Sequence, residues 1–171
     1  YGQGETQALR DGLLFHTAIL EPDVYEAQKF IDVQSKNTKK FKDAKQEFGK
    51  VFTMKEKDNA ERLAGAFLKN SELVSYLNKA EFEIPIAGTV MDMPFRGKAD
   101  IITKDGCIID LKTTTNISKF KYSAYNFSYD LQCYVYCNLF GVSYKNFKFI
   151  AIDKESFVPK YLDVSEEFYL S

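Results

Sequence analysis

FRGKADIITKDGCIIDLKTTT, residues 95–115, contains two β-rich runs separated by a turn sequence. The runs cover residues 95–103 and 107–115, and Lys104-Asp105-Gly106 lies between them. Asp-Gly between alternating apolar residues is typical of a tight hairpin, in which glycine takes the positive φ angle. The segment therefore predicts a β-hairpin with Thr103 opposite Cys107.

The predicted register brings acidic residues together. Counting three steps from Thr103 and Cys107 places Asp100 opposite Asp110 on the neighbouring strand. Side chains alternate between the two faces of a strand, so Asp110 and Lys112 share one face with Ile108. The other face carries Cys107, Ile109 and Leu111, which we expect to point into the core.

Two opposed carboxylates, Cβ atoms about 5 Å apart, destabilise a sheet unless a cation compensates them. Mg²⁺ prefers oxygen ligands and commonly uses one or two protein carboxylates together with water and phosphate. Asp100 and Asp110 are therefore candidate metal ligands, and Lys112 could orient a metal-bound water. The alternative is an exposed hairpin in which Asp110 and Lys112 only reduce each other's charge, because D-x-K is common by chance.

Length and composition narrow the class of protein. The chain has 171 residues, 45% hydrophobic and 27% charged, which is ordinary for one globular domain. It contains no apolar run long enough to span a membrane, and it begins at Tyr1 without Met, which indicates a trimmed N-terminus. Three scattered cysteines do not form a disulfide framework, and free thiols fit a reducing cytoplasm. A net charge of −1 gives no general basic character for nucleic-acid binding.

The order of predicted elements indicates a single α/β domain. Apolar spacing and capping residues predict helices over residues 5–20, 54–69 and 71–77, and a short strand at 30–33. Beyond residue 80 the chain changes to predicted strands at 81–87, 95–103, 107–115, 146–153 and 157–163, with helices at 118–125 and 129–140. The helical part covers about residues 1–79, and the part that contains the sheet covers about 80–171.

The hairpin, with GKAD at residues 97–100 and IDLKTT at 109–114, resembles the PD-(D/E)XK nuclease superfamily. More narrowly, it is similar to the exonuclease VIII (RecE-like) family of phage recombination nucleases, and also to RecB-type nuclease domains. Three further pieces agree in order and spacing: GLLFH at 12–16 followed by LEP at 20–22, Glu83 ahead of the hairpin, and YDLQ at 129–132 with Tyr136. The resemblance implies a restriction-endonuclease-like core, a mixed central sheet flanked by helices, with an N-terminal helical segment.

The resemblance also implies roles for individual residues. Asp100 and Asp110 would be the metal-binding acids, and Lys112 the catalytic lysine. His16 would approach the metal from the N-terminal helix and take part in catalysis, and the backbone carbonyl of Leu111 would complete the metal's ligands. For His16, the only histidine in the chain, the alternative is a hydrogen-bonded core residue.

Four further residues are candidates with open roles. Glu83 would be a ligand of a second metal, a group that supports a ligand, or a solvated strand residue. Gln132 and Tyr129 share a helix face and would touch DNA or orient the lysine, or else form a buried polar pair that caps the sheet. Lys98 would contact a phosphate or be a surface lysine.

The expected activity is hydrolysis of DNA that depends on Mg²⁺, with Mn²⁺ as an alternative. The resemblance implies an exonuclease that digests linear double-stranded DNA ends for recombination, as a homo-oligomer, with a single-strand annealing protein as partner, in the cytoplasm of a bacterial or phage-infected cell and without a membrane. The alternatives are an endonuclease or repair-associated nuclease of the same superfamily, or a non-catalytic DNA-binding module of this fold.

Overall fold

The computed structural model describes residues 5–120 and 129–164, and the chain divides into two compact units, Tyr1–Ala66 and Phe67–Ser171. This division falls within a helix, whereas the predicted change of character near residue 80 lies inside the second unit. Each unit is described by itself, and the prediction of one nuclease domain stays a prediction. Among the described residues, no helix has both the length and the apolar character needed to span a membrane.

The first unit consists mainly of helices. Its elements are α1 (Gln7–Leu20), α2 (Pro22–Glu26), β1 (Lys29–Ile31), α3 (Lys39–Phe48), β2 (Val51–Thr53) and most of α4 (Met54–Lys69). The sequence predicted α1, α4 and a strand near β1, but not β2, which pairs with β1 in parallel. Three-residue strands carry too little periodicity to be recognised. The core of this unit is formed by Leu14, Tyr25, Phe52 and Ala60.

A buried ion pair joins the two ends of this unit. Thr53 and Glu56 form the capping box that begins α4: the Glu56 N–H donates to Thr53 Oγ1 at 3.1 Å, and the Thr53 N–H donates to Glu56 Oε1 at 2.9 Å. Arg10 of α1 donates to both Glu56 oxygens at 2.8 Å and to the Val51 carbonyl at 2.7 Å. The cap of one helix therefore also fixes the position of another.

The second unit contains the sheet. It comprises α5 (Ser71–Leu77), β3 (Glu81–Val90), β4 (Met93–Ile102), β5 (Ile108–Thr114), η1 (Ile117–Lys119), α7 (Tyr129–Phe140), η2 (Tyr144–Asn146), β6 (Phe147–Asp153) and β7 (Pro159–Asp163). The strand order is β3-β4-β5-β6-β7, and only β5 and β6 are parallel. The predicted helix at 118–125 falls largely outside the described residues.

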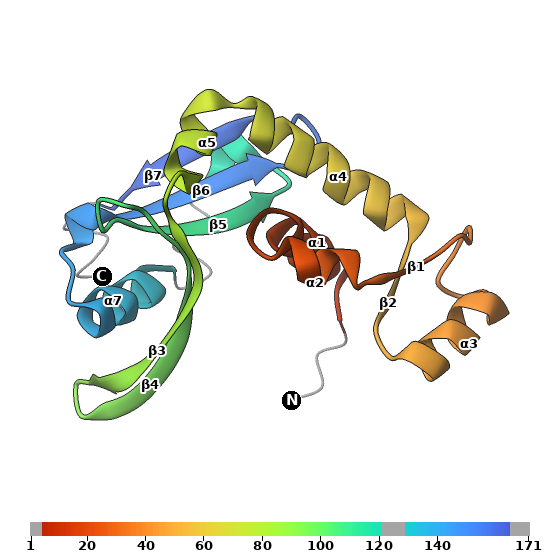
Figure 1. Ribbon diagram of the computed structural model, residues 1–171, viewed down its shortest axis with the longest axis horizontal. Coiled ribbons are helices and arrows are strands. Elements are labelled where there is room, and N and C mark those ends of the chain that lie inside the picture. Colours follow the sequence, from red (N-terminus) through yellow and green to blue (C-terminus); the bar gives the residue numbers. More distant parts are fainter. Residues whose placement is uncertain (1–4, 121–128, 165–171) are drawn as a thin grey trace. The chain divides into compact units, whose positions relative to one another are not determined.

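The β3–β4 hairpin is longer than the sequence predicted and leaves the rest of the sheet. Its pairing runs from Glu81 opposite Ile102 to Val90 opposite Met93, whereas the pairing of β4 with β5 is limited to Ile101–Ile109 and Ile102–Ile108. Figure 1 shows the hairpin curving away from β5. Among the described residues, therefore, no strand pairs with β4 over most of the hairpin's length.

Helix α7 packs on this hairpin and on the sheet. A Cβ atom at Gly97 would lie 2.4 Å from Tyr136 Cε1, and one at Gly88 would lie 2.9 Å from Leu139 Cδ2, so glycine permits both close approaches. The Tyr136 hydroxyl accepts from the Lys98 N–H at 3.3 Å and donates to the Lys98 carbonyl at 3.2 Å. This hydroxyl satisfies backbone groups that a strand would otherwise pair.

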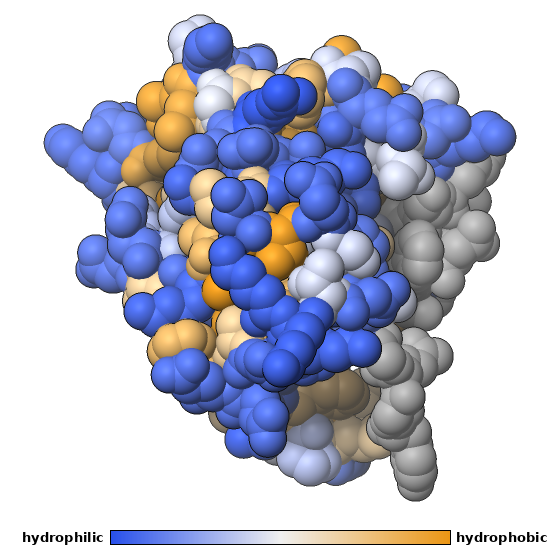
Figure 2. All heavy atoms as spheres, turned by 90° about the vertical axis from the view of Figure 1, so that its right-hand side faces the viewer, coloured by the Kyte–Doolittle hydropathy of each residue, from blue (hydrophilic) through white to orange (hydrophobic). Residues whose placement is uncertain are grey.

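The core of the second unit lies between the sheet and α7. It includes Ala99, Ile108, Phe147, Phe149, and the buried free thiols Cys133 and Cys137. The outside of the molecule is mostly polar on the face drawn in Figure 2, where hydrophobic side chains form only small patches. Exposed lysines of α3, among them Lys39, Lys42 and Lys45, form a solvated helix face in the first unit.

Candidate functional site

The hairpin that carries the acids has the predicted turn and register. Gly106 has a φ of 86°, and the Thr103 N–H donates to the Cys107 carbonyl at 2.8 Å. The strand pairs Ile101–Ile109 and Ile102–Ile108 continue, one step further, to Asp100 opposite Asp110. Local turn chemistry thus aligns the two carboxylates, as the sequence predicted.

The backbone ladder between the two strands ends at these acids. The N–H of Leu111 donates to Asp100 Oδ2 at 2.8 Å, and no backbone pair between β4 and β5 follows this point among the described residues. A side-chain carboxylate therefore takes the place of a backbone acceptor in the next position of the ladder. This bond fixes the orientation of the Asp100 carboxylate.

The sequence alternative of an exposed hairpin is wrong. Asp100 is 8% exposed and Asp110 is 3% exposed, and Ile108, on the predicted charged face, belongs to the core under α7. Both faces of β5 are buried, because α7 covers the face that carries Asp110. Two like charges in a buried position cost far more than at the surface, which makes a compensating cation more necessary.

Helix α7 supplies the polar groups that bind this pair. Gln132 donates from Nε2 to Asp110 Oδ1 at 3.0 Å, and its Oε1 accepts from Lys112 Nζ at 3.3 Å. The Lys112 ammonium lies 4.5 Å from the centre of the Tyr129 ring, which itself stacks on Phe149 at 5.5 Å. Gln132 and Tyr129 therefore both contact Lys112, and their predicted roles, in touching DNA or in orienting the lysine, stay predictions.

Burial and the neighbouring acid set the protonation of Asp100. Burial raises its pKa most, the Asp110 charge raises it further, and the sum places the pKa at about 8. Burial alone would lower the pKa of Lys112, but the Asp110 charge outweighs this and holds that pKa above its usual value. The site therefore contains a permanent ammonium beside an acid that releases its proton only near neutral pH.

Glu83 lies opposite Asp100 on β3, the strand that pairs with β4. The pairs Phe82–Ile101 and Ile84–Ala99 flank it, and its own φ is 52°, a left-handed conformation that is uncommon for glutamate. Its carboxylate lies 2.6 Å from Lys98 Nζ in an ion pair. Both residues thus lie beside the acid pair, with Glu83 paired to Lys98.

The donor set suits a hard divalent cation with two carboxylate ligands. Asp110 Oδ2 is buried, and the Lys112 ammonium lies 2.9 Å from it in an ion pair. Among the described residues, no three His, Cys, Asp or Glu side chains form a metal-binding group, so Glu83 does not complete one. Asp100 and Asp110 could bind a cation such as Mg²⁺, which commonly takes its remaining ligands from water and substrate phosphate.

His16 lies on α1 in the first unit, half-buried, with its ring centre 6.3 Å from that of Phe15. Its predicted approach to the metal stays a prediction, as does a metal contact of the Leu111 carbonyl. The structure does bring together Asp100, Asp110, Lys112, Gln132, Tyr129, Glu83 and Lys98, all from the second unit.

A mixed five-stranded sheet with flanking helices, which carries two acids and a lysine on adjacent strands, defines a PDDEXK-like domain. Residues 2–169 match the family described as "PDDEXK-like domain of unknown function (DUF3799)", and the chain belongs to this family. A search of curated proteins found no relative.

Several solved structures match the chain, and two of them are described here. A protein from Eubacterium rectale named "Putative exonuclease" matches with a TM-score of 0.71 and 14% identity, over 99% of this chain and 63% of its own. The chain thus spans less than two thirds of that protein, and the likeness shows the fold. SSO0001 matches with a TM-score of 0.38 and 14% identity, over 68% of this chain and 65% of its own.

The sequence did not predict that the Tyr136 hydroxyl, on α7, bonds to the backbone of β4 at Lys98. The residue was part of the resemblance, but its contact with Lys98 depends on packing between α7 and the hairpin. The signal that could have found it is Gly97: a glycine inside a strand often marks a close approach of another group.

Proposed function

We propose that the chain is a Mg²⁺-dependent deoxyribonuclease that hydrolyses phosphodiester bonds. The observation that supports this most is the buried pair Asp100–Asp110, with the Lys112 ammonium 2.9 Å from Asp110 Oδ2. Membership of a PDDEXK-like family adds support. Mn²⁺ would serve as an alternative metal, because it accepts the same oxygen ligands.

Each residue would have a distinct part in hydrolysis. A bound metal would lower the pKa of a water ligand and stabilise charge at the phosphate. Asp100, fixed by the Leu111 N–H, and Asp110, fixed by Gln132, would hold that metal. Lys112 would place a fixed positive charge where negative charge develops on the phosphate, and its contact with Tyr129 would keep it there.

The finer part of the proposal concerns the substrate and partners. We infer an exonuclease that degrades linear double-stranded DNA ends in recombination, as in the RecE-like family, and the structural likeness to a protein named as an exonuclease is consistent with this. A homo-oligomer, a single-strand annealing partner and action in the cytoplasm belong to the same inference. His16 and the Leu111 carbonyl would complete the metal's surroundings.

The decisive experiment uses end-labelled linear duplex DNA beside a covalently closed circle, with Mg²⁺ or EDTA. Wild type should degrade the linear DNA only when Mg²⁺ is present, and Asp110→Asn should be inactive because it lacks one carboxylate charge. Asparagine keeps the shape of the side chain and an oxygen for Gln132, so the variant should remain folded. Circular dichroism and thermal unfolding would check that.

The possible outcomes separate the rival functions. Cutting of the closed circle would replace the exonuclease with an endonuclease or a repair-associated nuclease. Binding of DNA without cleavage under any metal would leave a non-catalytic DNA-binding module. Full activity in Asp110→Asn would remove the site assignment itself.

A further inference from the structure

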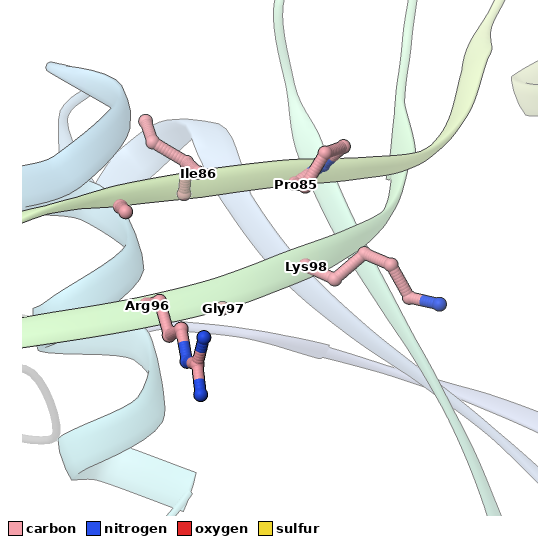
Figure 3. A pocket seen from close by; sticks show the side chains of 6 residues that line it. Pro85, Ile86, Arg96, Gly97 and Lys98 are labelled. Carbon is pink, nitrogen blue, oxygen red and sulfur yellow. The ribbon is translucent and has the colours of Figure 1, made fainter.

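The outer part of the β3–β4 hairpin carries a groove next to the acid pair. The groove has a volume of about 450 Å³ and is lined by Pro85, Ile86, Ala87, Arg96, Gly97 and Lys98. Figure 3 shows Pro85 and Ile86 on β3, with the Arg96 and Lys98 side chains extending from β4 so that their charged ends lie away from the strand. The groove thus has an apolar floor and a cationic rim.

The two cations of this groove are not equivalent. Lys98 is ion-paired with Glu83 at 2.6 Å, so its charge is largely balanced by a residue that also faces Asp100. Arg96 is exposed and makes no ion pair within the described ranges 5–120 and 129–164. Arg96 therefore supplies unbalanced positive charge to the groove, in a planar form suited to a phosphate group.

The position of the groove along β4 relates it to the acids. Lys98 and Arg96 precede Asp100 by two and four residues, which corresponds to about 7 and 13 Å along a strand. One strand of B-DNA advances about 3.4 Å along the helix axis per nucleotide, so these distances fall within about two to four nucleotides of a phosphate at Asp100. A DNA strand whose phosphate lies at the acids can therefore reach Arg96.

The groove is also held in a fixed shape. Strand alternation places Arg96 and Lys98 on the face opposite to Gly97, which the Tyr136 ring covers. The Tyr136 hydroxyl binds both backbone groups of Lys98, so the hairpin is supported where it has left β5. The hairpin can therefore present the face that carries Arg96 and Lys98 to a DNA backbone without changing its own conformation.

From these observations we propose that the groove is a subsite for the sugar–phosphate backbone of the DNA strand that enters the acid pair, with Arg96 as its phosphate-binding residue. The apolar floor formed by Pro85 and Ala87 would contact deoxyribose, and Arg96 would bind a phosphate near the one that is cleaved. This inference rests on the proposed function, because it takes DNA as the substrate.

The test measures binding of a fluorescein-labelled DNA duplex by anisotropy, in EDTA, so that neither metal nor cleavage is required. Arg96→Gln should weaken binding about 10- to 150-fold, as expected for loss of one charge-assisted hydrogen bond. The slope of log K against log salt concentration should fall by about 0.9, the value for one duplex phosphate contact. Arg96→Lys should keep that slope, because it keeps the charge.

Arg62→Gln is the matched control, since Arg62 is an exposed arginine on α4 and its removal changes net charge equally. Equal affinity and salt slope in Arg96→Gln and Arg62→Gln would overturn the subsite, as would absence of DNA binding by wild type. If wild type proves inactive as a nuclease but binds DNA through Arg96, the subsite stands and the proposed catalysis falls. If wild type cleaves DNA, Arg96→Gln should raise KM and leave kcat unchanged.

Discussion

Replacing Asp100 with asparagine should stabilise the metal-free protein, and the gain should grow with pH. The variant keeps a side-chain oxygen to accept from the Leu111 N–H, which is now bonded at 2.8 Å, but removes one of two buried like charges. Burial and the Asp110 charge raise the pKa of Asp100 from 3.8 to about 8. Over most of the pH range between these two pKa values, the folded protein therefore keeps a proton on Asp100 that the unfolded chain has released.

The sign and size of the effect follow from proton linkage. Because the native state binds more protons, wild-type stability falls as pH rises from about 4 to about 8, by up to about 1.4 kcal/mol for each pH unit. Asparagine does not titrate, so the advantage of Asp100→Asn should increase by about 2–4 kcal/mol between pH 5 and pH 8. That corresponds to about 5–15 °C in melting temperature.

Calorimetry or denaturant unfolding in EDTA at both pH values gives the comparison directly. Adding Mg²⁺ or Mn²⁺ at pH 8 should then stabilise wild type and raise its melting temperature. At a metal concentration of a hundred times Kd, the free energy of unfolding should rise by about 2.7 kcal/mol. The stability of Asp100→Asn should not change. A stability difference that is the same at pH 5 and pH 8, or a variant less stable than wild type at pH 8, would refute the reasoning.

Two further substitutions test the packing on which the site depends. Glu56→Gln should destabilise the protein by about 3 kcal/mol, because it removes the buried carboxylate that Arg10 binds through two nitrogens and leaves the buried charge only its ion pair with Glu5. Burial disfavours the ionised form of Glu56, but the hydrogen bonds from Arg10 and from the Thr53 N–H lower its pKa to about 2. The stability that wild type has over Glu56→Gln should therefore be lost as pH falls from 4.5 towards 2, which acid unfolding curves would measure. Gly97→Ala should cost about 1–3 kcal/mol of stability through its clash with Tyr136. A double-mutant cycle with Tyr136→Ala checks this, and additive effects would contradict the contact.

The features that the sequence predicted correctly are mainly those that depend on neighbouring residues in the chain. The register of the acid-bearing hairpin depends on Asp105-Gly106, where Gly106 takes the expected positive φ, and α7 ends at Gly141 for the same reason. The mixed sheet and its flanking helices were also predicted. Roles in metal binding and catalysis are consistent with the positions of Asp100, Asp110 and Lys112 but stay predictions.

The sequence did not predict features that depend on distant packing. The burial of Asp110 comes from α7, about 20 residues further along the chain, and a strand that alternates apolar and charged residues looks half-exposed when read alone. The full length of the β3–β4 hairpin was missed because Gly88 and Pro94 resemble strand breakers. Its turn uses Met91 and Asp92 at positive φ, where glycine or asparagine would have given the usual signal.

The short pairing between β4 and β5 divides the sheet mechanically. Two residue pairs join the long hairpin to β5, and both acids lie one step beyond the same end of this joint, Asp100 on the hairpin and Asp110 on β5. Beyond these pairs, the hairpin is held to β5 by the Leu111 N–H bond to Asp100 and to α7 by the Tyr136 hydroxyl. The bonds of Tyr136 to the Lys98 backbone therefore help to keep the acid pair aligned, although they lie outside the acid pair itself.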